Sequence, residues 1–374
     1  MRFLFIDSVP LTFGGGYEAF LLDLGKEARG RGHTVTVATP TPTIARAVGR
    51  MAGLTVEARL STDDIHRRQG NAELVTGGLL TLGRVLRKTD VVYMKNEPHE
   101  LLATMCLAQK DVPVVVGFHS AVSGRPGRTG KIRRGAYNSR PYRALLRRAG
   151  AFHTLQPAQT EWLVERHRMP REKVHCIPNG IDLARFRPSD RRLGDTVRLL
   201  FVGRLDVQKG IDTVIEALEV LESSDVPVSL TVAGDGPLRE LVERAQRRSA
   251  SLSYVGHVAE TAPLMSTHDL LIAPSRWEVS ALVPAEALAC GVPVITSSIP
   301  ENRIYDQTPA VEFCSPDDPG ALAKTIINTV EDSQRFPERH PQLRRAARRF
   351  AEEAVDQVRS MTRLLVVLER LVGQ

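Results

Sequence analysis

The sequence has few cysteines and no long apolar run. Its four cysteines, Cys106, Cys176, Cys290 and Cys314, are scattered, and none belongs to a C-x2-C pair. This scatter disfavours a zinc site or a disulfide framework and indicates buried thiols in a reducing cytoplasm. No window approaches eighteen apolar residues, so no membrane-spanning helix is expected. The first residues, MRFLFIDSVP, include an Asp and predict a strand instead of a signal peptide.

Length and charge narrow the class of protein further. A chain of 374 residues is long for one ordinary core and suits two domains. The composition is that of a globular protein, with 42% hydrophobic and 25% charged residues. A net charge of +7 would suit nucleic acid, anionic lipid or a polyphosphate ligand, and charge alone does not choose among them.

Strand-like and helix-like runs alternate in both halves of the chain, which is typical of a parallel sheet wound with helices. The expected strands are 2–7, 33–39, 90–94 and 112–118, and then 197–203, 228–234, 270–275 and 292–297. Residues 176–194, rich in Pro, Gly, Asn and Asp, indicate a linker. We therefore expect an α/β protein of two Rossmann-like, doubly wound domains facing across a cleft, where such folds bind ligands.

Two loops that follow expected strands carry candidate chemistry. In FGGGYE, Gly15 and Gly16 would let backbone N–H groups approach an anion at a helix N-terminus, although a plain turn explains three glycines equally well. Arg204 and Lys209 follow the strand that ends in Gly203. Cations at a helix N-terminus are unfavourable because the helix dipole prefers anions there, but a diphosphate bound between the two cations would make the placement favourable. Two solvated surface cations are an equal alternative.

Two carboxylates stand in the otherwise apolar stretch 275–294. Glu278 is expected on the loop after the strand LLIAPS, and Glu286 just inside the next helix, whose first turn takes Pro284. The simplest alternative is one exposed acid and one capping acid. Carboxylates accept hydrogen bonds, and sugars and riboses offer hydroxyl donors. Beside a basic diphosphate loop, the two carboxylates would suit one hydroxyl pair on a sugar and another on a ribose.

In their order and spacing, these motifs resemble glycosyltransferase family 4, whose members have the GT-B fold of two Rossmann-like domains. The resemblance covers nearly the whole chain and runs through GGGYE, RGHTVTVAT, GFHS, IPNGIDLARFRP, VGRLDVQKGID, VAGDGP and the Glu-x7-Glu stretch followed by ALACGVPVI. It implies an acceptor-binding domain over 1–180 and a nucleotide-sugar-binding domain over 181–354. A C-terminal helix over about 355–374 would pack back on the first domain.

The family pattern implies a role for each matching residue. Arg204 and Lys209 would hold the nucleotide diphosphate and stabilise it as a leaving group. Glu286 would bind the ribose hydroxyls and Glu278 the hydroxyls of the donor sugar, with His119 beside that sugar. The other donor-binding residues that the pattern implies are Gly15, Gly16, Gly203, Ser280, Ala281 and Leu282.

The implied reaction is that of a hexosyltransferase. A sugar would move with retention of configuration from a UDP- or GDP-sugar to a hydroxyl of a glycan, lipid-linked, glycoconjugate or small-molecule acceptor. No metal and no cofactor are expected, because the implied catalysis is electrostatic and no Asp-x-Asp pair stands beside the site. The family usually has Gly-Phe-Gly after the first glutamate. Val279, Ser280 and Ala281 stand there in this chain, which implies an unusual donor pocket.

Acidic residues are missing from 112–160, and residues 125–148 carry nine Lys or Arg. This basic stretch would suit an anionic membrane surface or an acidic acceptor, and a solvated arginine-rich face is the alternative. Nucleic acid is not an expected partner, because no nucleic-acid-binding module is recognised. The expected location is the cytoplasm, with peripheral association at the inner face of the membrane.

Two other functions stay open. A catalytically silent relative would bind a nucleotide sugar or a partner protein and transfer nothing, which the altered Val-Ser-Ala loop would allow. A sugar-nucleotide epimerase of the same fold would need acid and base carboxylates in the cleft and a different glycine pattern. Detection of transferred, unchanged or isomerised donor sugar distinguishes the three.

Overall fold

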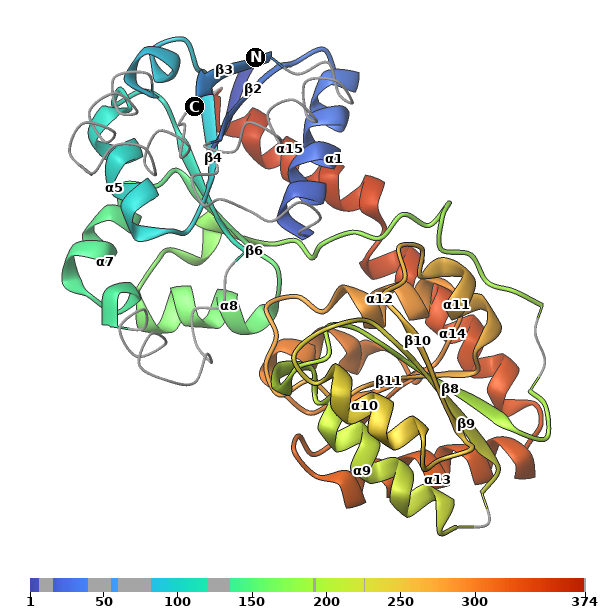
Figure 1. The fold of residues 1–374 in the computed structure, drawn as a ribbon. Coiled ribbons are helices and arrows are strands. Elements are labelled where there is room, and N and C mark those ends of the chain that lie inside the picture. Colours follow the sequence, from blue (N-terminus) through green and yellow to red (C-terminus); the bar gives the residue numbers. More distant parts are fainter. Residues whose placement is uncertain are drawn as a thin grey trace. The chain divides into compact units, whose positions relative to one another are not determined.

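The computed structural model divides into two compact units, Met1–Pro178 with Val358–Gln374, and Asn179–Gln357 (Figure 1). It describes residues 1–6, 16–39, 55–59, 82–119, 135–190, 193–224 and 226–372. The unit bounds differ by a few residues from the 1–180 and 181–354 expected from the sequence. The expected cleft concerns the placement of one domain against the other, and it stays a prediction.

Seven parallel strands form the sheet of the first unit, in the order β3-β2-β1-β4-β5-β6-β7. Their bounds are β1 Arg2–Ile6, β2 Thr34–Thr39, β3 Thr55–Arg59, β4 Val91–Lys95, β5 Val114–Phe118, β6 Ala151–Thr154 and β7 Val174–Cys176. Every residue of β4, β5 and β6 is buried. Burial along the whole strand is typical of parallel strands that are covered on both faces.

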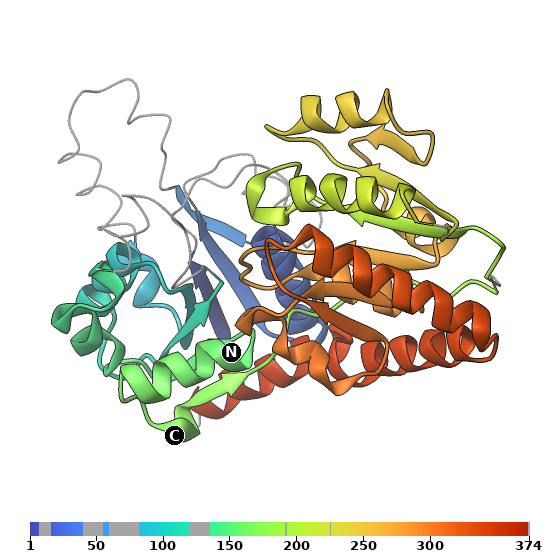
Figure 2. The same ribbon diagram turned by 90° about the horizontal axis from the view of Figure 1, so that it is seen from below.

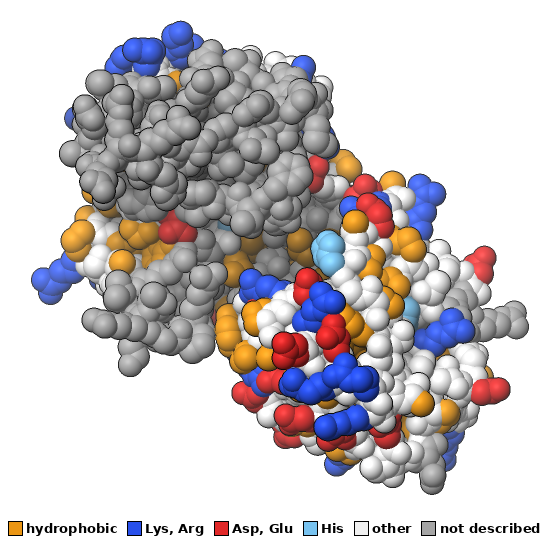
Figure 3. All heavy atoms as spheres, in the orientation of Figure 1, with side chains coloured by type: hydrophobic (Ala, Val, Ile, Leu, Met, Phe, Trp, Pro, Cys, Tyr) orange, Lys and Arg blue, Asp and Glu red, His pale blue; other side chains and the backbone are white. Residues whose placement is uncertain are grey.

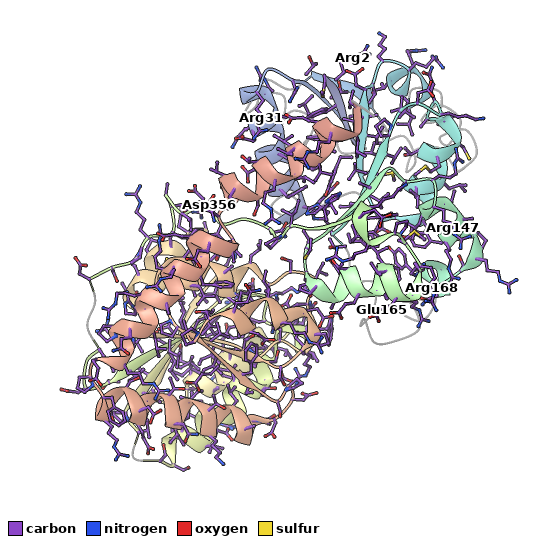
Figure 4. The ribbon with its side chains drawn as sticks, turned by 180° about the vertical axis from the view of Figure 1, so that it is seen from behind. Arg2, Arg31, Arg147, Glu165, Arg168 and Asp356 are labelled. Atoms are coloured by element: carbon purple, nitrogen blue, oxygen red, sulfur yellow. The ribbon has the colours of Figure 1, made fainter. Side chains whose placement is uncertain are left out.

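Helices cover both faces of this sheet. On one face lie α1 (Gly16–Gly30) and α15 (Gln357–Val372), whose Leu24 and Leu365 pack with Tyr93 of β4. On the other face lie α5 (Pro98–Leu107), α7 (Arg140–Leu146) and the π-helix η1 (Trp162–Arg166). Arg31, just after α1, lies beside α15 (Figure 4), and its guanidinium is 3.5 Å from Glu369. The chain's last helix thus completes the core of the first unit.

The second unit holds six parallel strands in the order β10-β9-β8-β11-β12-β13. Their bounds are β8 Val197–Val202, β9 Val228–Ala233, β10 Leu252–Gly256, β11 Leu270–Ala273, β12 Val294–Ser297 and β13 Val311–Cys314. One face is covered by α9 (Ile211–Glu222), α10 (Arg239–Gln246) and α13 (Pro319–Arg335), and α9 and α13 lie side by side (Figure 2). The other face carries α11 (Ala262–Thr267), α12 (Leu282–Ala289) and α14 (Arg339–Ala354). Both units are therefore doubly wound, as predicted.

The strand order of the second unit reverses beside its first strand. From β8 the chain adds β9 and β10 on one side, and then crosses over to add β11, β12 and β13 on the other. The switch point therefore lies between β8 and β11, and the crevice outside their carboxyl ends is where such sheets bind ligands. The two loops that leave these ends are the sequence-predicted loops that start at Gly203 and at Ser275.

The prediction that all four cysteines are buried is wrong for two of them. Cys290 and Cys314 are buried, but Cys106 is exposed and Cys176 is partly exposed; all four are free thiols. Leu101 and Met105, four residues apart, form the core-facing side of α5, so Cys106 falls on the opposite side with Leu102, which is 52% exposed. None of the helices in the described ranges combines the length and apolar character that a bilayer span requires.

Candidate functional site

An ion pair joins the two loops at the switch point of the second unit. Lys209 Nζ donates to Glu278 Oε1 over 2.6 Å, and Glu278 is only 5% exposed. The loop after β8 begins at Gly203, where a side chain at the neighbouring Gly234 would collide with the Gly203 carbonyl oxygen. The two glycines thus let the loops that follow β8 and β9 pack closely.

Arg204 lies on the same loop and is more exposed. Its Nε is 2.5 Å from Asp206 Oδ2, its Nη2 donates to Gln208 Oε1 over 3.1 Å, and its side chain is 60% exposed. Asp206 also accepts from the Lys209 backbone N–H, at 3.1 Å, and so begins the 3-10 turn η3 (Val207–Lys209). Both cations therefore have carboxylate partners. The sequence reasoning weighed a bound diphosphate equally against two solvated surface cations and did not foresee Asp206 and Glu278 as partners. The diphosphate stays a prediction.

Arg276, which the sequence reasoning did not single out, ties these loops together. Its guanidinium makes two hydrogen bonds to Asp212, of 2.7 and 2.9 Å, and another of 2.6 Å to Asp317. The guanidinium also donates to the Val207 carbonyl, and the backbone N–H of Arg276 donates to the Gln208 carbonyl. These carboxylates raise the pKa of Arg276. The fork geometry of arginine thus fixes the turn that carries Lys209.

Glu286 lies inside α12, as predicted, and is half-buried. Thr261 Oγ1 donates to its Oε2 over 3.2 Å. Burial raises the pKa of this carboxyl, and the Thr261 hydrogen bond and the charge of Arg185 oppose that shift. The preceding residues are held from outside the helix, since Tyr305 donates its hydroxyl proton to the Ala281 carbonyl over 2.7 Å.

The remaining predicted donor residues lie at the start of the same helix. Ser280 Oγ accepts a hydrogen bond of 3.3 Å from Asn179 Nδ2, and Ala281 and Leu282 are half-buried. A cavity of about 20 Å³ lies beside the ion pair, which is room for one water molecule. Lys209, Glu278, Ser275, Thr296 and Asn302 are its polar lining residues.

His119 belongs to the first unit and directly follows β5, where the sequence placed it. Its ring is half-buried against Tyr17 and Phe20, with ring centroids 4.6 and 4.4 Å away. His119 Nε2 lies 2.6 Å from the Tyr93 hydroxyl, and that hydroxyl lies 2.6 Å from His153 Nδ1. The pKa of His119 is well below its usual value because of burial first and the nearby His153 and Lys95 second.

Two predicted elements fall partly outside the described ranges. Gly15 lies outside them, and Gly16 is described only as the first residue of α1. Of the basic stretch 125–148, residues 125–134 lie outside. In the rest, Arg140 begins α7 and is exposed. Arg147, which directly follows α7, is exposed as well (Figure 4). No group of three or more His, Cys, Asp or Glu side chains in the described parts is arranged to hold a metal ion.

The visible face of the second unit is mixed in charge. Over α9 and α10 the cationic and anionic side chains are interspersed (Figure 3). On α10, Arg239 pairs with Glu243 at 2.7 Å and Arg244 with Glu240 at 3.6 Å. This face has no field of one sign of the kind that nucleic-acid binding uses.

Two doubly wound parallel-sheet units make up the GT-B fold of glycosyltransferases, which the sequence predicts. Residues 14–185 match the family model described as Glycosyltransferase Family 4, and residues 196–332 match the one described as Glycosyl transferases group 1. The chain therefore carries a Glycosyltransferase Family 4 domain followed by a Glycosyl transferases group 1 domain. This confirms the family that the motifs predict.

Similar proteins share this architecture. Glycogen synthase of Mycobacterium tuberculosis is 30% identical over 233 residues, which cover 59% of this chain and 55% of that protein. The GDP-mannose-dependent alpha-(1-6)-phosphatidylinositol dimannoside mannosyltransferase of the same organism is 33% identical over 190 residues, 47% of each chain. The chain thus spans about half the length of these curated relatives. The crystal structure of Anabaena HepE in complex with UDP and glucose has the same fold, with a TM-score of 0.75 and 18% identity over 99% of this chain and 100% of that chain.

Proposed function

We propose that this protein is a retaining glycosyltransferase that needs no metal. It moves a sugar from a UDP- or GDP-linked donor to a hydroxyl of a glycan, lipid-linked or other glycoconjugate acceptor. The observation that carries the proposal is the Lys209–Glu278 pair at the switch point between β8 and β11, with Arg204 beside it. The relatives support both donor classes, since one is named for its dependence on GDP-mannose and HepE was crystallised with UDP.

The charges of this site match a sugar joined to a diphosphate. Lys209 and Arg204 supply two cations for the phosphates, and each already lies next to a carboxylate with which an anionic ligand would compete. One oxygen of Glu278, Oε1, is occupied by Lys209, and the carboxylate keeps further acceptor capacity at Oε2 for sugar hydroxyls. Glu286 on α12 offers a second acceptor for the ribose.

In the proposed reaction, the bond between the anomeric carbon and the diphosphate oxygen breaks as a bond to the acceptor hydroxyl forms on the same face. The hydroxyl proton goes to the departing diphosphate. Charge grows on that diphosphate in the transition state, and preorganised cations stabilise it without reorganising. Arg204 and Lys209 take the part that a metal ion has in other phosphate chemistry, and Arg276 holds the turn that bears Lys209.

A membrane-bound acceptor is the favoured class. The dimannoside mannosyltransferase relative is named for a phosphatidylinositol acceptor. Arg140 is the first residue of α7, Arg147 directly follows its last residue, and both are exposed. Each cation near an anionic surface contributes about 1 kcal/mol to binding. Peripheral association of the first unit would therefore bring the enzyme to a lipid-linked acceptor.

The test is product analysis with UDP-glucose and GDP-mannose, each with and without EDTA and a lipid extract as acceptor. A transferred sugar with the donor's anomeric configuration, formed in EDTA, supports the proposal. An isomerised donor would instead identify an epimerase. Nucleotide binding without any product would identify the catalytically silent alternative.

A further inference from the structure

Three polar side chains from neighbouring strands form a buried hydrogen-bonded chain under His119. Tyr93 lies on β4 and His153 on β6, and His119 follows β5 between them. The Tyr93 hydroxyl is 2.6 Å from His119 Nε2 and 2.6 Å from His153 Nδ1. His153 Nε2 lies 2.8 Å from the Ile177 carbonyl oxygen. The order is thus His119, Tyr93, His153 and the backbone of Ile177.

Strand β5, between β4 and β6, leaves room for this hydrogen-bonded chain of side chains. Gly117 of β5 pairs in register with His153 of β6, and a side chain at Gly117 would collide with the Tyr93 hydroxyl. The φ of Gly117 is not in the left-handed region, so the backbone conformation does not require glycine at this position. The absence of a Cβ therefore serves to let the Tyr93 hydroxyl reach both imidazoles.

The proton positions follow from the last acceptor in the chain. A carbonyl oxygen only accepts, so His153 Nε2 must donate to Ile177. His153 is buried, and burial lowers its pKa to about 4, so the neutral ring has only that one N–H. His153 Nδ1 is then an acceptor, and Tyr93 donates to it. Because a hydroxyl has a single proton, Tyr93 must accept from His119 Nε2.

We propose that Tyr93 and His153 are positioning residues that hold His119 in the Nε2–H tautomer, so that its Nδ1 is a fixed hydrogen-bond acceptor for a hydroxyl of the donor sugar. The proposal rests on the proposed function and on the family pattern, which implies that His119 lies beside the donor sugar. Nδ1 has no hydrogen-bond partner among the described residues, and the ring is half-buried, not sealed. Packing against Tyr17 and Phe20 fixes the ring plane.

The arrangement predicts different tautomers of His119 for two substitutions. In His153→Leu, the Tyr93 hydroxyl keeps only His119 Nε2 as an acceptor, so His119 switches to the Nδ1–H tautomer and presents a donor to the ligand. In Tyr93→Phe, no hydroxyl selects the tautomer, and His119 populates both. Tyr142→Phe is the matched control, because Tyr142 is equally buried in the same unit and its hydroxyl donates to the Asn96 carbonyl, away from His119.

The first readout is the tautomer itself, from long-range proton–nitrogen NMR of the full chain labelled with ¹⁵N-histidine, with His119 assigned by His119→Gln. We expect the Nε2–H form in the unsubstituted protein and in Tyr142→Phe, the Nδ1–H form in His153→Leu, and a mixture in Tyr93→Phe. An Nδ1–H form in the unsubstituted protein, or one tautomer in all variants, would overturn the proposal. If His153→Leu does not fold, Tyr93→Phe still decides.

The second readout is the kinetics with whichever of UDP-glucose and GDP-mannose the unsubstituted protein uses. We expect His153→Leu and Tyr93→Phe to lose about 10-fold or more in kcat/KM, as for loss of one hydrogen bond, and Tyr142→Phe to lose little. A switched tautomer with unchanged kcat/KM would refute the sugar contact and leave the transferase function standing. If the tautomers behave as expected but no donor binds or reacts, the proposed function fails, and with it the sugar contact; only the tautomer assignment survives.

Discussion

Lys209 and Glu278 lie 69 residues apart in the sequence and meet at 2.6 Å, between the loops that follow β8 and β11. The carboxylate is nearly buried, whereas the lysine side chain is 25% exposed. The buried Glu278 carboxylate therefore holds the Lys209 ammonium at a position where it is partly exposed to solvent. That arrangement is suited to an anionic ligand that approaches at the switch point of the sheet.

Removal of the lysine should affect catalysis more than folding. Lys209→Ala is expected to lower kcat by on the order of 10²-fold, as for loss of one group that stabilises charge in a transition state. Steady-state kinetics measure this loss. The matched control is Lys324→Ala, which removes an exposed lysine from α13 in the same unit and should leave kcat unchanged. Equal rates for the two variants would contradict the assigned role of Lys209.

Arg276 should act through the turn that it holds. Arg276→Ala removes hydrogen bonds to Asp212, Asp317 and the Val207 carbonyl. Each hydrogen bond to a charged group contributes about 1.5–3 kcal/mol, so the free energy of unfolding should fall by at least that amount. The Kd for the nucleotide should also rise, and calorimetry measures it.

Two variants control the Arg276 experiment. Arg276→Lys keeps the charge but not the fork and should recover little of the binding. Arg239→Ala breaks an exposed pair with Glu243 on α10 and should change neither stability nor Kd measurably. Full recovery of nucleotide binding by Arg276→Lys would show that charge, not geometry, holds the turn.

Much of the fold could be predicted because buried parallel strands read as continuous apolar runs. The predicted strands at 90–94, 112–118 and 228–234 agree with β4, β5 and β9 to within two residues. The strands β3, β6, β7, β10 and β13 were not predicted, because their short runs, such as TVEAR, AFHT and VHC, mix polar with apolar residues.

The site could be predicted only where it lies in line with the strand ends. Arg204, Lys209 and Glu278 follow the carboxyl ends of β8 and β11, so their loops could be located from the pattern alone. The roles of Arg276 and His153 could not be predicted, because they depend on partners that are distant in the sequence. The local sequence around Arg276 does not indicate that Asp317 contacts it, and the short run AFHT does not indicate that the Tyr93 hydroxyl reaches His153.

Gly210 should tolerate no side chain, for two separate reasons. Its φ of +71° lies in the left-handed region, and an added Cβ would collide with the Pro274 carbonyl oxygen. Gly256 has a similar φ of +74° but open space around it. Gly256→Ala should therefore cost about 1–2 kcal/mol from the backbone alone, and Gly210→Ala distinctly more. Urea unfolding compares the two, and equal losses would show that the contact with Pro274 is unimportant.

Two buried histidines should make the protein less stable in acid. Burial lowers the pKa of His153 and of His167 to about 4, and nearby Arg143 and Arg166 add to the shift at His167. The unfolded chain therefore binds more protons below pH 6.5, so stability is full above that pH and falls as pH decreases toward 4. Each histidine should contribute on the order of 2 kcal/mol of loss at pH 5.

Urea unfolding at pH 7 and pH 5 checks this dependence, with His167→Phe as the informative variant. The phenyl ring retains the tilted ring contact with Trp162, whose centroid lies 4.0 Å from that of His167, and it does not titrate. The variant should therefore lose less stability than the unsubstituted protein between the two pH values. An equal loss in both proteins would mean that other groups, such as carboxylates, dominate the acid response.

The most direct measurement is thermal unfolding with UDP, GDP and ADP, each with EDTA, for the unsubstituted protein and Lys209→Ala. A ligand at a hundred times its Kd stabilises a protein by about 2.7 kcal/mol, which shifts the midpoint visibly. The account predicts that UDP or GDP raises the midpoint of the unsubstituted protein in EDTA, and that Lys209→Ala loses most of the shift. No shift with any nucleotide, or an undiminished shift in the variant, would contradict a diphosphate site at the Lys209–Glu278 pair.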